Sequence, residues 1–503
     1  MTRPSVRPFW IRSERYSKAV DDQPHLTFKA REGSQRILQT QIVRATPPTT
    51  DCNQRLSLAR ITDDWFFSYT MRYRSTAGKS PLTSLRGAVL RGLAPDGGLY
   101  MPAEIARHTP EELEEFRRLP FTEVCFRLVR PFATPDVPEE VLWQIVAEAI
   151  NFPVKLVSLS PALHILELFH GPTLAFKDFG ARFLARLMGY FVRGESRQLT
   201  VLVATSGDTG SAVAHGFLDV PGIRVVILYP SKRISEAQEK QFTTLGQNII
   251  ALEISGSFDD CQRLVKQAFA DEQLNQRAFF TSANSINVGR LLPQMFYHVA
   301  AYRQLPVASI PLIVAVPSGN FGNLTAGIFA KRVGLPVARF IAATNANDVV
   351  PQYLLSGEYR PRPALATYSN AMDVGNPNNF PRLLDLCRNR IENVRKEIWG
   401  HGATDEETLR EMHAVWDRYR YVSDPHTAVG IDAWEAYRKE HPEPSQGLVL
   451  ATAHPAKFAD VVQKAIGQAP PLPERLARYL HQPKLSVPMS TDYSAFKQFL
   501  LSH

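Results

Sequence analysis

The chain is poor in cysteine and has no long apolar segment. Its four cysteines, among 503 residues, lie far apart and form no C-x-x-C pair, which argues against a disulfide framework or a structural zinc site. H-E-x-x-H is absent and the 13 histidines do not cluster with cysteines, so we expect no metal site. No run of 18 apolar residues is free of charge, so we expect no transmembrane helix and no membrane partner. These absences favour a cytoplasmic protein.

Two nucleotide-binding signatures are also missing. The chain contains no G-x-G-x-x-G fingerprint, which argues against a dinucleotide site. Gly78-Lys79-Ser80 imitates the end of a P-loop, but position 73 is Tyr rather than Gly and no strand is predicted before it. We therefore exclude a P-loop nucleotidase.

The net charge of +8 is spread along the chain. Residues 1–70 hold 11 Lys and Arg against 7 Asp and Glu, and the remainder holds 46 against 42. A nucleic-acid surface needs basic residues clustered on one element, and we find no such cluster after residue 70. The charge suits recruitment of an anionic small molecule instead, and no nucleic-acid partner is expected.

Residues 1–70 differ from the rest of the chain in composition and in hydrophobic pattern. They are rich in Arg, Gln, Thr and Pro and show no sustained period before a short apolar patch at 65–67. Four acidic residues among the first 32 argue against a transit peptide, and no apolar core marks a secretory signal. We interpret the segment as a disordered or non-native extension; translation from Met71 is the alternative explanation.

An α/β core is predicted beyond about residue 160. Short apolar, β-branched runs alternate there with helical patterns, which is typical of parallel strands buried on both faces. Helical patterns also cover 110–118 and 138–151, and the stretch 385–420 reads as wholly helical, with a capping box from Thr404 to Glu407. The expected strands are 200–204, 224–228, 248–252, 312–316, 339–343 and 447–451.

Two of these strands end in loops suited to anions. Ser318-Gly-Asn-Phe-Gly-Asn-Leu-Thr-Ala-Gly327 would direct backbone amides toward a phosphate at a helix N-terminus, although a tight strand-to-helix turn is the alternative. Ala204-Thr-Ser-Gly-Asp-Thr-Gly-Ser211 offers hydroxyls and amides to a second anion, unless Asp208 or Thr209 merely caps the helix. Together the loops favour two phosphate-bearing ligands.

Lys177 is the candidate nucleophile. It lies between Phe176 and Phe179 in an apolar stretch, where desolvation would lower its pKa and free the amine for imine formation. The alternative is a structural lysine that extends past the aromatic rings or pairs with Asp178.

The stretch 169–180, Phe-His-Gly-Pro-Thr-Leu-Ala-Phe-Lys-Asp-Phe-Gly, resembles the cofactor-lysine motif of threonine synthases, which are fold type II pyridoxal-phosphate enzymes. The resemblance covers most of 71–503 and is to the longer bacterial and fungal subgroup. It implies an α/β fold like that of the tryptophan synthase β subunit, with parallel-sheet lobes and an N-terminal domain. The other matching motifs are 91–102, 204–210, 282–290, 317–323, 373–378, 424–430 and 451–455.

The resemblance also implies a domain division and roles for single residues. Residues 71–160 would form the N-terminal domain and 161–503 the catalytic core, whose two α/β lobes carry a helical insertion near 385–420. Lys177 would hold pyridoxal phosphate covalently, Asp208 would lie beside the ring's 3-oxygen, and Thr452 would bond the pyridine nitrogen. The cofactor phosphate would be bound by Gly319, Asn320, Phe321, Gly322 and Asn323, and the substrate phosphate by Thr205, Ser206, Asn287 and Arg290.

The implied reaction converts O-phospho-L-homoserine and water into L-threonine and phosphate. Two alternatives stay open at this point: a related lyase or dehydratase that gives a 2-oxo acid, and a non-catalytic binding protein. For Arg290, a structural ion pair is the alternative to a role in substrate binding.

We expect a chain beginning at Met71 to fold and act like the full-length protein, because residues 1–70 carry no periodic apolar pattern from which a core can be built. Solubility, thermal unfolding and turnover of the two chains should agree. A large loss in the shorter chain would show that the extension is an integral part.

Overall fold

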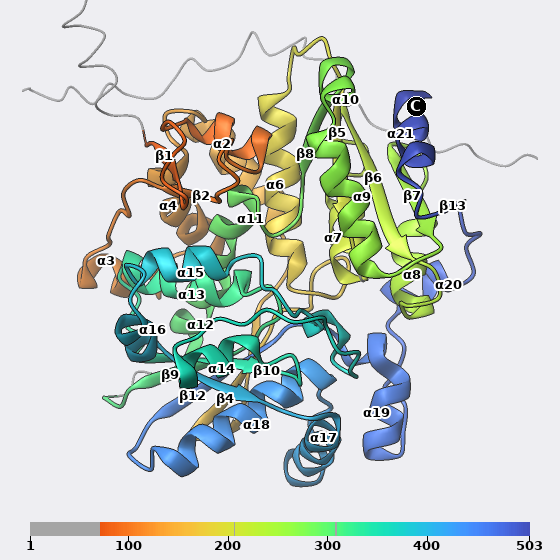
Figure 1. The fold of residues 1–503 in the computed structure, drawn as a ribbon. Coiled ribbons are helices and arrows are strands. Elements are labelled where there is room, and N and C mark those ends of the chain that lie inside the picture. The colour runs from red at the N-terminus through yellow and green to blue at the C-terminus, as the bar shows by residue number, and fades with distance from the viewer. Residues whose placement is uncertain (1–70, 206, 307–308, 503) are drawn as a thin grey trace, which may run out of the picture. The chain divides into compact units, whose positions relative to one another are not determined.

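The computed structural model describes residues 71–205, 207–306 and 309–502 (Figure 1). The interpretation of residues 1–70 lies outside this range. Within the described residues, no helix combines the length and the apolar content needed to cross a membrane.

The region after Met71 joins a small sheet to four helices. Strands β1 (Tyr73–Ser75) and β2 (Tyr100–Pro102) pair antiparallel, and the buried Tyr73 hydroxyl donates to the carbonyl of Phe132 at 2.6 Å. This bond ties the sheet to helix α4. The helices predicted at 110–118 and 138–151 are present as α3 and α5. The four helices are α2 (Leu85–Arg91), α3 (Pro110–Phe116), α4 (Phe121–Ala133) and α5 (Glu139–Ala149).

A five-stranded sheet, wholly parallel, forms the first lobe of the core. Its order is β13-β7-β6-β5-β8, and three of the six predicted strands lie in it, as β5, β6 and β7. The strands are β5 (Leu199–Ala204), β6 (Ile223–Pro230), β7 (Ile249–Ile254), β8 (Phe279–Ser282) and β13 (Ser486–Met489).

A six-stranded sheet forms the second lobe, with the order β11-β10-β9-β12-β4-β3. The other three predicted strands are its β9, β10 and β12, and only the edge strand β3 runs antiparallel. The strands are β3 (Lys155–Ser160), β4 (Leu163–Glu167), β9 (Leu312–Pro317), β10 (Arg339–Thr344), β11 (Ile398–Gly402) and β12 (Gln446–Ala451).

Helices cover both faces of the second sheet. Neighbouring residues of a strand point to opposite faces, so each strand packs against helices on both sides. In β12, Val449 packs into the cluster that contains Trp434 of α18 (Pro425–Glu440). Leu448 and Leu450 pack instead into the cluster that contains Ile328 of α13 (Gly322–Val333). This two-sided burial explains why the strands read as unbroken apolar runs.

The prediction of a wholly helical stretch at 385–420 is wrong in its middle. Strand β11 lies there and pairs parallel with β10, between α16 (Ile391–Glu397) and α17 (Asp405–Tyr419). Its sequence, Ile-Trp-Gly-His-Gly, is short and half-exposed at the sheet edge, so it carries no strand signal of its own. The capping box is confirmed: Thr404 accepts from the Glu407 backbone, and the Glu407 side chain accepts from that of Thr404.

Gly447 in β12 should not tolerate a side chain. A Cβ there would lie 2.5 Å from the ring of Trp434, which is fully buried and cannot move aside. We expect Gly447→Ala to destabilise the protein by about 1–3 kcal/mol, seen as a lower midpoint of thermal unfolding. Gly189→Ala is the comparison, because its Cβ would meet only the tip of Val220 and alanine favours the helix. Equal midpoints for the two variants would contradict the packing argument.

Candidate active site

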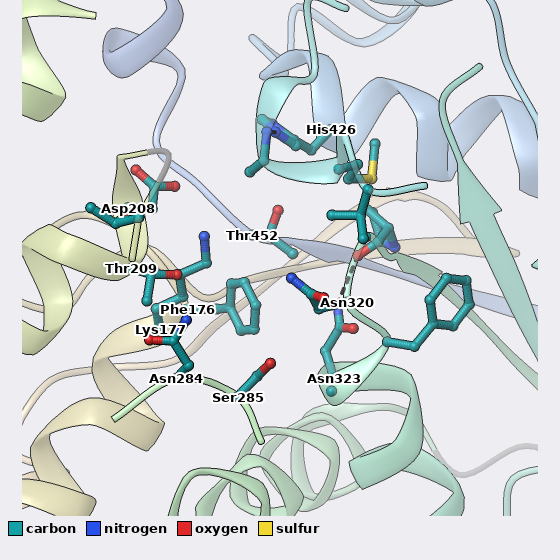
Figure 2. Close-up of a pocket in the computed structure, with 18 of the residues that line it drawn as sticks. Phe176, Lys177, Asp208, Thr209, Asn284, Ser285, Asn320, Asn323, His426 and Thr452 are labelled. Carbon is teal, nitrogen blue, oxygen red and sulfur yellow. Dashed lines mark hydrogen bonds between the residues drawn. The ribbon is translucent and has the colours of Figure 1, made fainter. Parts of the chain in front are cut away.

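One pocket lies at the carboxyl ends of strands from both sheets. It is lined by Ala204 at the end of β5, Asn284 after β8, Pro317 at the end of β9 and Thr452 after β12. Figure 2 shows Lys177 and Asp208 on one side of this pocket and Asn320 and Asn323 on the other. Ligands of parallel α/β sheets bind at this edge, where the strand ends direct their loops toward each other.

Lys177 is the first residue of α6 (Lys177–Phe191) and faces the pocket. The preceding loop is held to β12, because the Phe176 amide donates to the Thr452 carbonyl at 2.9 Å. Within the described residues, Nζ of Lys177 makes no hydrogen bond or ion pair. Burial lowers the pKa of Lys177 to about 8; Asp208 opposes this effect, while Lys457 and Arg290 add to it.

The neighbours of Lys177 do not neutralise it. Both oxygens of Asp178 accept hydrogen bonds from Thr173, at 2.9 Å from the amide and 2.7 Å from the hydroxyl. Burial raises the pKa of Asp178 to about 6, although these bonds oppose the shift. Phe179 packs edge-on against Phe152 in the core rather than against the pocket. The pairing with Asp178 that the sequence left open is therefore absent.

Asp208 begins α7 (Asp208–Phe217) and lies in a buried polar cluster. Lys457 contacts its Oδ1 at 2.6 Å, and the Gln238 side chain donates to the same oxygen at 2.9 Å. Burial opposes ionisation of Asp208, but Lys457 and Lys177 outweigh it and hold the pKa of the carboxyl well below its usual range. A permanent carboxylate thus lies beside the Lys177 amine.

The loop between β9 and α13 offers unused donors. The backbone N–H groups of Gly319, Asn320 and Phe321 have no acceptor among the described residues, and all three residues line the pocket. Phe321 adopts a left-handed conformation with φ of 58° and leads into Gly322, the first residue of α13. Free amides at the start of a twelve-residue helix form a site for a phosphate.

Other contacts hold this loop in shape. The Asn323 amide donates to the Pro317 carbonyl at 2.7 Å, and its Oδ1 accepts from Ser318 at 3.1 Å. A Cβ on Gly319 would lie 2.8 Å from the Cα of Met372, so only glycine fits there. Asn323 therefore lines the pocket but has its side chain engaged in closing the loop.

Thr452 and Arg290 both reach the pocket. Within the described residues, no hydrogen bond involves the Thr452 hydroxyl. Arg290 is buried and donates to the Ala283 carbonyl at 2.7 Å, while its Nε has no hydrogen-bond partner among the described residues. Burial lowers the pKa of Arg290 to about 10. Among the described residues Arg290 makes no ion pair. The structural ion pair that was the alternative from the sequence is therefore absent.

Of the remaining residues predicted to bind the substrate phosphate, one lines the pocket and one does not. Thr205 lines the pocket, but its hydroxyl accepts from the amides of Gly207 and Gly210 at 3.0 and 2.8 Å and so shapes the turn. Ser206 lies outside the described residues. Asn287 does not line the pocket. Its side chain caps α11 (Val288–Leu291) and donates to the carbonyls of Val89 and Ser282, which leaves it no role toward a ligand.

Several residues at or beside the pocket were not singled out from the sequence. Asn284 and Ser285 lie inside the matching motif 282–290, and His426 lies inside 424–430, so the motifs contained them without singling them out. Lys457 lies two residues beyond the motif 451–455, and its only signal was a lysine in an apolar setting.

Comparison with known proteins agrees with the geometry. Three family models match the chain: pyridoxal-phosphate dependent enzyme over 154–453, threonine synthase N terminus over 72–150, and threonine synthase C-terminal over 427–500. The chain is 45% identical over 421 residues to the threonine synthase of Escherichia coli strain K12, covering 84% of this chain and 97% of that protein. The chain belongs to the threonine synthase family. The resemblance found in the motifs is confirmed.

Other members of the family support the assignment. The threonine synthase of Saccharomyces cerevisiae is 36% identical over 456 residues, covering 78% of this chain and 89% of that protein. The crystal structure of the Escherichia coli threonine synthase superposes with a TM-score of 0.81 at 43% identity, covering 86% of this chain and all of that one. A pyridoxal-phosphate-bound threonine synthase from Brucella melitensis also gives 0.81, at 35% identity and with coverage of 86% and 99%. The predicted fold class and enzyme class are confirmed.

The pocket fits the cofactor that the family uses. Pyridoxal phosphate needs an amine for its aldehyde, donors for its phosphate and polar groups around its ring. The structure offers the unbonded, desolvated amine of Lys177, the three free amides of 319–321, and the Asp208 carboxylate and Thr452 hydroxyl. The donor set therefore matches all three needs.

Lys457 should tune the Lys177 amine. Only the neutral amine reacts with the aldehyde, so the rate at which the apoprotein takes up pyridoxal phosphate should rise with pH, with a midpoint at about 8, and level off at higher pH. Lys457→Met removes a repelling cation and frees Asp208 to attract Lys177. Both effects raise the pKa of Lys177, so the midpoint of the profile should move to higher pH.

Lys331→Met is the matched control, because Lys331 pairs with Glu397 at 2.7 Å outside the pocket. It should leave the midpoint of cofactor uptake in place. An unchanged midpoint in Lys457→Met would show that Lys457 does not set the charge of Lys177.

Proposed function

We propose that this protein converts O-phospho-L-homoserine and water into L-threonine and inorganic phosphate with pyridoxal phosphate as cofactor. The observation that carries the proposal is the pairing of two sites in one pocket. Free amides at the start of α13 suit one phosphate, and the buried Arg290 beside Asn284 and Ser285 suits a second. A cofactor and a substrate that each bear a phosphate satisfy both.

In this proposal Lys177, Asp208, Thr452 and the loop 319–323 hold the cofactor. Lys177 anchors it covalently, the loop amides bind its phosphate, and Asp208 lies near the ring's 3-oxygen. Thr452 donates to or accepts from the ring nitrogen; a neutral hydroxyl does not force that nitrogen to be protonated. When bound, pyridoxal phosphate stabilises negative charge on the carbon atoms next to the substrate's amine.

Arg290 is the main residue proposed for the substrate phosphate. Its guanidinium group is buried without a carboxylate partner among the described residues, so a phosphate would supply the missing negative charge. Asn284 and Ser285 line the same pocket, and Oδ1 of Asn284 has no partner among the described residues. Thr205 supports this region through its turn. Asn287 is not assigned to the substrate, because its side chain bonds backbone groups instead.

Lys177 is proposed to move the protons. With a pKa of about 8, part of the amine is neutral near neutral pH and can accept the proton from the substrate's Cα. After releasing this proton to water, the amine can accept a second one from Cβ. The Cγ–O bond breaks and phosphate leaves, held by Arg290. The protonated amine returns one proton to Cγ, a water molecule adds its hydroxyl to Cβ, and Cα is reprotonated. In total, one proton moves from Cβ to Cγ, Cα regains the proton that it lost, the hydroxyl of water goes to Cβ and the other proton of water goes to the released phosphate, which balances the reaction.

The proposal also includes a domain division, a location in the cell and a partner. Residues 71–160 are assigned to an N-terminal domain and 161–503 to the catalytic core, supported by the separate family matches at 72–150 and 154–453. A cytoplasmic location is supported by the thiols of Cys125, Cys261 and Cys387, which are buried and unpaired. The proposed partner is the small-molecule substrate.

The reaction is tested directly by product analysis. Purified protein with pyridoxal phosphate should form threonine and inorganic phosphate from O-phosphohomoserine in equal amounts. Free homoserine should be turned over at least 100-fold more slowly, because hydroxide is a poor leaving group and the anion site stays empty. Arg290→Ala should impair use of the substrate far more than retention of the cofactor.

Two outcomes would overturn the proposed reaction. One is 2-oxobutyrate as the main product, which would make the protein a dehydratase or related lyase. The other is efficient turnover of free homoserine, which would show that the second anion site has another purpose. Borohydride reduction followed by peptide mapping checks Lys177 separately, since the cofactor should be fixed to that residue.

A further inference from the structure

Arg382 is a fully buried arginine without a counter-ion. It lies on α15 (Phe380–Leu386) with 0% of its surface exposed, and it forms no ion pair with any carboxylate in the described part of the chain. Burial lowers the pKa of Arg382 to about 9. Buried guanidinium groups are normally paired, because removing a charge from water is costly.

The donors of Arg382 go to carbonyl groups and one amide. Nε and Nη2 reach the Tyr100 carbonyl at 3.2 and 2.9 Å, and Nη2 also reaches the Ile286 carbonyl at 2.6 Å. Nη1 donates to the Ser285 carbonyl at 3.1 Å and to Oδ1 of Asn379 at 2.8 Å. One side chain thus joins β2 to the loop that carries Asn284 and Ser285 into the pocket.

Asn379 extends this connection to the other side of the pocket. Its Nδ2 donates to the Ser285 hydroxyl at 3.1 Å, and its backbone amide donates to the Asn320 carbonyl at 3.2 Å. Asn320 belongs to the loop with the free amides. Arg382 and Asn379 therefore tie together the two loops that line opposite parts of the pocket.

Arg290 and Arg382 hold the 283–286 loop from its two ends. Arg290 binds the carbonyl of residue 283, and Arg382 binds those of residues 285 and 286. Both guanidinium groups are buried, and neither has a carboxylate within ion-pair distance among the described residues. The loop between them lacks negative charge, and a bound phosphate dianion would supply it.

We propose that Arg382 is a positioning residue for the substrate phosphate, which holds the 283–286 loop so that Asn284 and Ser285 present their polar groups to the anion. This inference rests on the proposed function. It differs from a purely structural role, in which Arg382 would only anchor β2 to the core through Tyr100.

Arg382→Lys tests the proposal, because lysine keeps the charge but cannot reach four acceptors with a fixed fork. We expect unchanged cofactor content, a KM for O-phosphohomoserine raised about tenfold, and an inhibition constant for inorganic phosphate raised by a similar factor. The change in kcat should be smaller than the change in KM.

Arg303→Lys is the matched control. Arg303 on α12 (Met295–Gln304) also donates to backbone carbonyls, those of Phe116 and Leu119, without a carboxylate partner, and it does not line the pocket. Both variants should lower the midpoint of thermal unfolding. Only Arg382→Lys should change the KM and the phosphate inhibition constant.

The outcomes separate the inference from the function. If the wild-type protein turns over O-phosphohomoserine and both constants stay within twofold in Arg382→Lys, Arg382 is only a structural anchor and the proposal is wrong. No turnover by the wild type would overturn the proposed function, and the inference with it.

Should Arg382→Lys not fold, Asn379→Ser tests the same connection, because it removes the Ser285 contact and leaves three carbonyl contacts of Arg382 intact. It should raise both constants, and unchanged constants would overturn the inference.

Discussion

Buried positive charge is the constraint on which the organisation of this pocket depends. Lys457 and Arg290 are buried at or beside it and Lys177 is half-buried, and Asp208 is the single carboxylate that forms an ion pair with any of them in the described chain. Lys457 and Asp208 largely satisfy each other. The Lys177 amine is therefore left partly deprotonated, and Arg290 is left with an unpaired donor. A pocket with this balance favours ligands that bring negative charge.

The fold supplies the surroundings that make this charge useful. Parallel strands from two separate sheets end at the same place, so their loops can meet without long connections. The backbone amides of the loop before α13 remain free because the loop has a fixed conformation. The Asn323 side chain bonds its start, and Gly319 allows its close approach to Met372. The charged side chains thus act next to preorganised neutral donors, which need little rearrangement when an anion binds.

Much of the fold could be predicted because burial leaves a simple pattern. Six strands of the two sheets are continuous apolar runs, and all six were expected. The strands that escaped prediction are short, lie mostly at sheet edges or are interrupted by polar residues. β4, for example, contains His164, whose ring contacts Ser158 at 2.8 Å, and β11 contains two glycines. Edge and mixed strands are stabilised by their neighbours rather than by their own composition.

The sequence by itself determined the parallel α/β core and the strand-end loops and pointed to Lys177 as the candidate amine, because each depends on residues close together in the chain. The tertiary structure alone decided which polar groups are free. Asp208 meets Lys457 across 249 positions, and Arg382 meets Tyr100 across 282. Asn287 was expected to bind the substrate phosphate, but its side-chain amide donates to the carbonyl of Val89. A side chain can bind a ligand only when no other part of the protein satisfies it, and that depends on contacts between residues distant in the sequence.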